Sequence, residues 1–150
     1  MREMNKSKVL SYSTGTLLLF VGIGAAVVGV GLVIEPSGDR IELPLELLKT
    51  SPFEDFLIPG FILFVINGFG SLIGALLVFL NNRFAGFTTM ILGIAMIIWI
   101  TAQVIWIGWE SVLQPIFLGV GLVELALGFL LTDWAIEHGL FKRHQHPHAR

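Results

Sequence analysis

Four long apolar segments dominate this chain of 150 residues. They cover residues 10–34, 61–80, 84–107 and 112–131, and none of them contains Lys or Arg. The hydrocarbon core of a bilayer is about 30 Å thick and is crossed by about 20 apolar helical residues. The segments are continuously apolar and longer than a barrel strand of about 10 residues. The sequence therefore predicts an all-α membrane protein, a single four-transmembrane-helix bundle over residues 1–150.

The composition argues against other classes of protein. Hydrophobic residues make up 55% of the chain and charged residues 13%. An average soluble domain has roughly twice that share of charged residues. So little polar surface cannot cover a water-soluble globule, which argues against a soluble enzyme, a nucleic-acid-binding protein and a disordered regulator. The chain has no Cys, which excludes disulfides, a thiol nucleophile and a thiolate metal site.

The basic residues flanking the segments predict the orientation of the chain in the membrane. Seven of them flank the two termini and the loop between the second and third segments: Arg2, Lys6, Lys8, Arg83, Lys142, Arg143 and Arg150. Only Arg40 and Lys49 fall on the other side, among seven acidic residues. Cytoplasmic loops carry the excess of Lys and Arg. We therefore expect a multi-pass protein of the cell inner (plasma) membrane with both termini cytoplasmic.

The only long loop, between the first and second segments, contains a pattern typical of a short helix. Residues 43–58 are predicted to form an amphipathic helical segment in this first extracytoplasmic loop. Ser51, Pro52 and Glu54 match the N-cap, N1 and N3 positions of a capping box.

One face of this amphipathic segment is apolar. Phe53, Phe56 and Leu57 are spaced to share that face, which is expected to lie at the outer membrane interface. Pro59 and Gly60 are expected to break the chain direction before the second segment descends. The simplest interpretation is a lid over the outer end of the bundle, and the alternative is a gate or a docking surface for a partner.

Two stretches carry a resemblance to a known kind of protein. They are LPLELLKTSPFEDFLIPG at residues 43–60 and the stretch 103–121, which contains Trp109, Ser111 and Leu113-Gln114-Pro115. Both resemble a pattern in an uncharacterised family of small bacterial four-helix integral membrane proteins. The resemblance extends over most of the chain and implies a fold but no activity.

Glu124 is the most informative residue within the apolar segments. It lies about twelve residues into the fourth segment, which at 1.5 Å per residue is near the bilayer midplane. A carboxylate there is costly unless it is paired or protonated, and no basic residue is available at that depth. We expect a neutral, hydrogen-bonded acid at pH 7, acting as a proton carrier or as a hydrogen-bonding contact between helices.

Three further polar residues are predicted near this acid. Ser71 is expected at the depth of Glu124, with Asn67 one turn further out on the same face and Gln103 at the depth of Asn67. The group would line a small outward-facing polar pocket. The alternative is a set of interhelical hydrogen bonds worth about 0.6 kcal/mol each.

Small residues recur at spacings that favour close helix packing. Pairs of them lie in the first, second and fourth segments: Gly22 and Ala26, Gly70 and Gly74, and Gly121 and Gly128. Most must serve packing within the bundle, and one face of the first segment is a candidate contact in a homo-oligomer.

No motif for phosphate binding, zinc hydrolysis or a serine nucleophile is present. We therefore expect a protein that is not an enzyme and has no cofactor or metal site. Residues 139–150 are expected to form a disordered, solvated tail attracted to anionic lipid, and the alternative for its His residues is weak binding of a transition metal. The partners of the protein would be the lipid bilayer and a homo-oligomer or larger membrane complex, with no nucleic acid.

The leading functional hypothesis is an accessory or self-associating subunit that acts through helix packing. The alternative is a proton-coupled small transporter or channel that uses Glu124 as its proton site. A membrane enzyme acting on lipid has only Glu124 and the acidic outer loop in its favour.

Overall fold

The computed structural model describes residues 1–139 of the chain, and this part is all-helical. Four helices are long and apolar enough to span a membrane, as the sequence predicts: Met4–Ile34, Leu57–Phe79, Ala85–Ile107 and Leu113–Glu137. Apart from Gly139, the predicted tail with His144, His146 and His148 lies outside the described residues.

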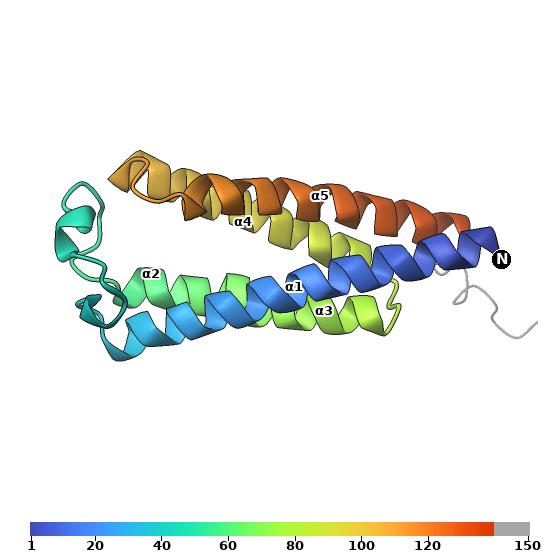
Figure 1. Cartoon of the computed structure of the whole chain (residues 1–150), viewed down its shortest axis with the longest axis horizontal. Coiled ribbons are helices and arrows are strands. Elements are labelled where there is room, and N and C mark those ends of the chain that lie inside the picture. Colours follow the sequence, from blue (N-terminus) through green and yellow to red (C-terminus); the bar gives the residue numbers. More distant parts are fainter. Residues whose placement is uncertain (140–150) are drawn as a thin grey trace, which may run out of the picture.

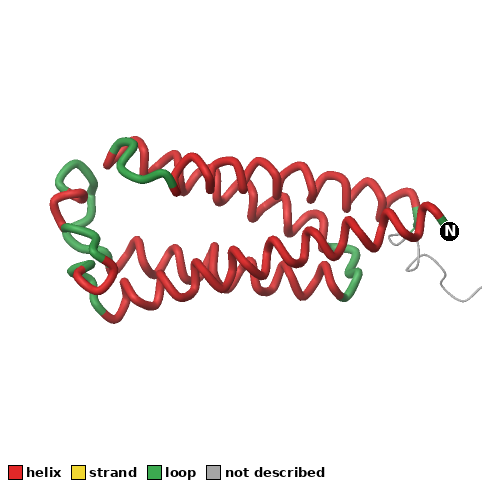
Figure 2. Tube along the Cα trace, viewed as in Figure 1, coloured by secondary structure: helices red, strands yellow, loops and turns green. Residues whose placement is uncertain are grey.

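The helices form two antiparallel pairs (Figures 1 and 2). The first pair joins α1 (Arg2–Ile34) to a second helix built from α2 (Leu57–Ile62), the π-helical segment η3 (Leu63–Phe69) and α3 (Gly70–Phe79). The second pair is α4 (Ala85–Ile107) and α5 (Leu113–Glu137). The N-terminus and the end of α5 lie at one end of the bundle, hereafter the terminal end. The linker of residues 35–56 lies at the other, hereafter the linker end.

Three observed helix boundaries differ from the predicted ones. The first helix begins at Arg2 and not near residue 10, so the basic N-terminal flank is helical as well. The second spanning helix begins at Leu57, so that Pro59 and Gly60 lie inside it and do not break it. Pro59 is the third residue of that helix, where a backbone N–H has no partner within the helix, and proline is tolerated there. The fourth spanning helix runs on to Glu137 because Thr132 and Asp133 do not interrupt the helical hydrogen bonding.

The linker contains two short 3₁₀ turns, η1 (Asp39–Ile41) and η2 (Leu45–Leu48). Ser51 Oγ accepts a hydrogen bond from Phe53 N at 3.2 Å and donates one to Leu48 O at 2.9 Å. No helix follows, because the chain bends through residues 51–56, so the predicted capping box is not formed. The next helix has Phe56 at its N-cap and no side-chain cap, while Asp55 Oδ1, one residue earlier, accepts a hydrogen bond from Leu57 N at 2.9 Å.

The second helical pair is held by backbone contact at glycines. A Cβ atom at Gly93 would lie 2.6 Å from the Gly121 carbonyl oxygen, and one at Gly128 would lie 2.6 Å from Met90 N. A Cβ atom at Gly86 would lie 2.8 Å from the Gly128 carbonyl oxygen. The four glycines Gly86, Gly93, Gly121 and Gly128 therefore let α4 and α5 approach to backbone distance along most of their length.

The first pair packs in the same manner, with glycines on both helices. A Cβ at Gly22 would meet Leu72 N at 3.0 Å, and one at Gly68 would meet Ala26 N at 2.9 Å. Gly70 and Gly74 face the side chain of Leu92 on α4 and so bring the two pairs together. All six residues predicted from the small-residue spacing thus lie at helix–helix contacts.

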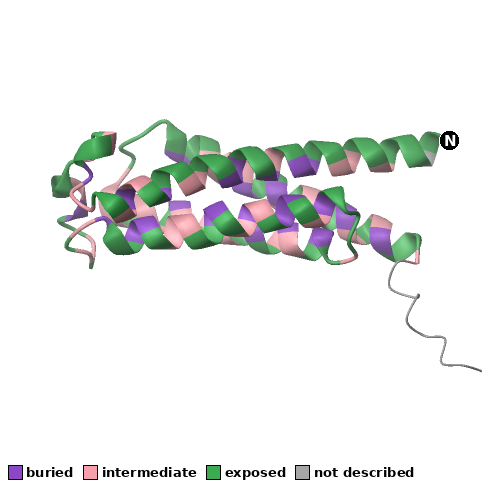
Figure 3. Cartoon of the chain, turned by 90° about the horizontal axis from the view of Figure 1, so that it is seen from below, coloured by how far each residue is buried: buried purple, intermediate pink, exposed green. Residues whose placement is uncertain are grey.

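The two pairs join mainly in the terminal half of the bundle. Their shared apolar cluster is formed by Leu18, Ala75, Val78, Ala85, Leu92 and Leu131. In Figure 3 the buried residues follow the inner sides of the helices, while the N-terminal part of α1 is mostly exposed. Toward the linker end α1 and α5 have little contact.

The glycine contacts of the second pair lead to a stability prediction. Gly128→Ala places a methyl group against backbone atoms that cannot move aside, and overpacking of this kind typically costs about 1–3 kcal/mol. We expect a lower midpoint of thermal unfolding in detergent, followed by tryptophan fluorescence. The matched control is Gly119→Ala on the same helix, where an added Cβ meets nothing within 4 Å. Equal midpoints for the two variants would contradict the assignment.

Candidate functional site

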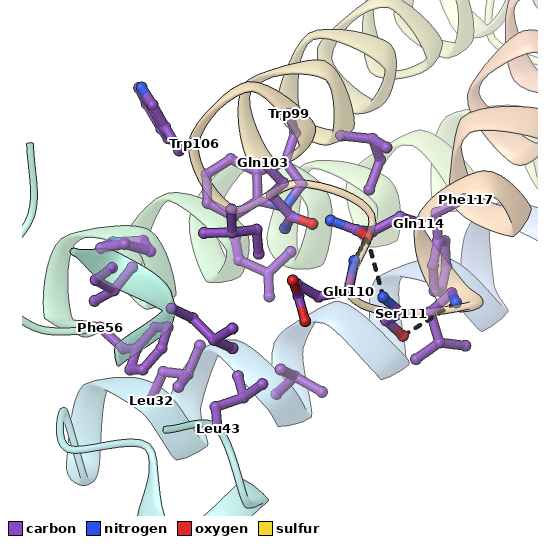
Figure 4. A pocket seen from close by; sticks show the side chains of 18 of the residues that line it. Leu32, Leu43, Phe56, Trp99, Gln103, Trp106, Glu110, Ser111, Gln114 and Phe117 are labelled. Carbon is purple, nitrogen blue, oxygen red and sulfur yellow. Dashed lines mark hydrogen bonds between the residues drawn. The ribbon is translucent and has the colours of Figure 1, made fainter. Parts of the chain in front are cut away.

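A cleft of about 600 Å³ opens between the two helical pairs at the linker end (Figure 4). One wall is a face of α1 with Val21, Ala25, Val28 and Leu32, which recur at helical spacing. The opposite wall comes from α4 and the start of α5, and it includes Met96, Trp99, Ile100, Gln103 and Phe117. The volume of the cleft is in the range of small-molecule sites in proteins.

The floor of the cleft is a second apolar cluster, made of Val21, Met96 and Ile100. Trp99 and Phe117 pack against this cluster. These two side chains belong to the second helical pair. Trp99 and Phe117 occupy more space than the glycines nearer the terminal end. This difference in size accounts for the separation of the two pairs toward the linker end.

The linker forms the roof of the cleft and contacts both pairs. Leu48 and Phe56 are buried in one cluster with Leu32 of α1. On the other side the Phe53 ring meets the Trp106 ring edge to face, with centroids 5.3 Å apart, and the Thr50 hydroxyl donates to the Trp106 carbonyl oxygen. The linker therefore ties the end of α1 to the end of α4.

Of the eight residues named for the amphipathic segment and the break after it, three are buried, two are half-buried and three are exposed. Phe56, Pro59 and Gly60 are buried, while Phe53 and Ser51 are half-buried and line the cleft. Pro52 and Glu54 are exposed, and Leu57, expected on the apolar face, is 43% exposed. Residues 51–56 form bends and not a helix, so these side chains do not share one face as helical spacing would predict.

The polar residues predicted as a pocket are not gathered around the cleft. Gln103 lies in the cleft wall, whereas Asn67, Ser71 and Glu124 are outside its lining. All three are at most 2% exposed. Only the Gln103 member of the predicted group is therefore accessible from the linker end.

Glu124 is enclosed between helices. It is 1% exposed, and its Cβ lies against the position that a Cβ of Gly93 would occupy, at 3.1 Å. Neither carboxyl oxygen has a hydrogen-bond partner among the described residues, and the same holds for the Asn67 Nδ2 atom. Buried polar groups usually have partners, so these two positions are unusual features of the bundle interior.

Gln114, for which the sequence predicted no role of its own, organises the turn between α4 and α5. Its Oε1 accepts from Glu110 N at 2.9 Å and from Ser111 N at 3.2 Å. Its Nε2 donates to Gly108 O at 3.0 Å. The turn is thus held by three hydrogen bonds from one buried side chain.

Sequence reasoning also missed the two acids at the mouth of the cleft, Glu42 and Glu110. In Figure 4 the Glu110 carboxylate and the Gln103 amide lie in the space between α1 and α4. Glu110 lies in the turn between α4 and α5, so its place at the same cleft as the linker could not be predicted from local spacing. Among the described residues, no three His, Cys, Asp or Glu side chains converge as a metal site would require.

Comparison with protein-family models, with curated proteins and with solved structures finds no match to this chain.

Proposed function

We propose that this chain is a non-enzymatic integral membrane protein that acts through helix packing, as a self-associating or accessory subunit of a membrane assembly. The proposal rests on the contacts that the small and polar residues of the four long helices make. Glycines bring backbones together, and Thr89, Thr101 and Thr132 each donate to the carbonyl oxygen four residues earlier, at 2.7–2.9 Å. The glycine contacts pack helix against helix, and the threonine hydroxyls are satisfied within their own helices.

The exposed face of α1 is the proposed contact between copies. Phe20, Ile23, Val27, Val30 and Ile34 follow one another at alternating spacings of three and four residues, and each is at least 39% exposed. This heptad-like spacing suits packing against another helix. The stripe lies opposite the face of α1 that lines the cleft, so a contact between copies would leave the cleft open.

Self-association through α1 is tested by cysteine cross-linking, which the Cys-free chain makes simple. Val27→Cys lies in the stripe and is 68% exposed, while the matched control Ile98→Cys on α4 is 64% exposed. Across a two-fold contact, residues close to the axis meet their own copies. We expect oxidation in membranes at low protein density to give a covalent dimer of Val27→Cys and none of Ile98→Cys. Equal dimer yields, or monomer alone at both positions, would contradict the proposal.

We also propose that both termini face the cytoplasm and that the linker lies outside. Support comes from the excess of Lys and Arg at the terminal end and of acidic residues at the linker end. We expect a membrane-impermeant maleimide to label Glu46→Cys in intact cells, and Asn5→Cys only after permeabilisation. Both native side chains are exposed, so access to the reagent depends on orientation. The reverse labelling pattern would refute the orientation.

A proton-coupled carrier is the second candidate, and one observation favours it. A carboxyl group lies in a membrane span with both oxygens buried and without a partner among the described residues. Intramembrane acids of this kind often mark proton pathways. Against it, the Glu124 side chain is outside the lining of the cleft.

Proton flux separates this second candidate from the first. For a carrier, Glu124→Gln, which keeps the shape of the side chain but cannot release a proton, should lower flux into liposomes to the level of protein-free vesicles. The control is Gln103→Ala, a cleft-wall substitution that should leave flux unchanged. If flux is the same for wild type and Glu124→Gln, the carrier hypothesis fails.

A further inference from the structure

The cleft at the linker end has an apolar interior that no described part of the chain fills. Aliphatic and aromatic side chains line it from the floor at Val21, Met96 and Ile100 to Leu32, which lies nearer the linker end. Val21 and Leu32 are eleven positions apart on α1, which corresponds to about 16 Å along the helix axis. The space is therefore elongated along the helices and suits a linear apolar chain.

The mouth of the cleft is acidic. Glu42 and Glu110 line it, both are exposed, and no Lys, Arg or His is among the described residues that form its lining. The rest of the linker end has the same sign, with seven acidic and two basic residues in positions 35–59 and at Glu110. Such a field attracts cations to the mouth and repels anions.

A hydrogen-bonding group also faces the cleft. The Gln103 side chain lies in its wall, one turn of α4 below Trp106, and makes no hydrogen bond to any residue in the described part of the chain. An amide in such a place is satisfied by water or by a bound molecule. It gives the upper part of the cleft a polar group between the acidic mouth and the apolar floor.

We propose that the cleft binds a single-chain amphiphile with a cationic head group. The alkyl chain lies along α1 toward Val21, and the head group lies at the mouth beside Glu42 and Glu110. The acidic mouth selects the sign of the head group, and the apolar walls select the chain. This inference goes beyond the proposed helix-packing function and does not depend on it, because the cleft and the exposed α1 stripe are on opposite faces of that helix.

The test uses the full chain in phosphatidylcholine nanodiscs and radiolabelled dodecyltrimethylammonium, with empty nanodiscs subtracted. We expect saturable binding that unlabelled dodecyltrimethylammonium displaces. Three other probes should fail to displace it: dodecyl sulfate has the wrong charge, dodecyl maltoside has no charge, and tetramethylammonium has no chain. Displacement by dodecyl maltoside as effective as by the cation would mean an apolar site that bulk lipid can fill, and would overturn the proposal.

Two kinds of variant locate the binding. The double variant Glu42→Gln and Glu110→Gln removes the charge at exposed positions, and we expect binding to weaken roughly three- to tenfold. Gly24→Leu fills the cleft, because Gly24 lines it and an added Cβ meets nothing within 4 Å. We expect it to abolish saturable binding.

The matched control for the cleft-filling variant is Gly119→Leu. Gly119 is also helical with open space around an added Cβ, but it does not line the cleft. Wild-type binding by Gly119→Leu together with loss in Gly24→Leu supports the site. Unchanged affinity in the double Gln variant, or equal binding by the two leucine variants, would refute it.

Discussion

Close approach of helix backbones at glycine is the interaction on which the rest of this structure depends. Inside a bilayer there is no hydrophobic drive to bring helices together, so association relies on dispersion contacts and on hydrogen bonds. The contact of Gly93 with the Gly121 carbonyl and of Gly128 with Met90 brings α4 and α5 within backbone distance. The same kind of contact at Gly22 and Gly68 joins the first pair. Two tight pairs result, and the distance between the pairs differs from one end of the bundle to the other.

The separation of the pairs at the linker end follows from which side chains meet there. In the terminal half, Gly74 receives the Leu92 side chain, and Ala75 and Ala85 are part of the shared cluster. At the other end Trp99 and Phe117 occupy the second pair, and the linker bridges the opening through the Phe53 and Trp106 rings. A bundle with small residues at one end and aromatic residues at the other closes at the first and leaves a cleft at the second.

Much of the membrane architecture could be predicted from the chain, because hydrocarbon imposes strict demands on segment length and on backbone hydrogen bonding. All four helices were predicted, while the first, second and fourth extend beyond their predicted ends. The predictions failed where the usual effect of a residue type did not apply at that residue's position in the helix. Pro59 is tolerated in a first helical turn, and the helix begins at Leu57 without the side-chain cap that the Ser51 pattern suggested. The π-helical segment at Leu63–Phe69 left no signal in the spacing of apolar residues.

The sequence by itself determined the number of helices long and apolar enough to span a membrane and the position of Glu124 within one of them, since both are properties of a single segment. Only the tertiary structure decided which polar residues share a space. It separated Gln103 from Asn67, Ser71 and Glu124, and it brought Glu42 from the linker and Glu110 from the turn to the mouth of one cleft. The reason is that depth in the membrane is additive along a helix, whereas the facing of one helix to another depends on side-chain packing between segments far apart in the chain.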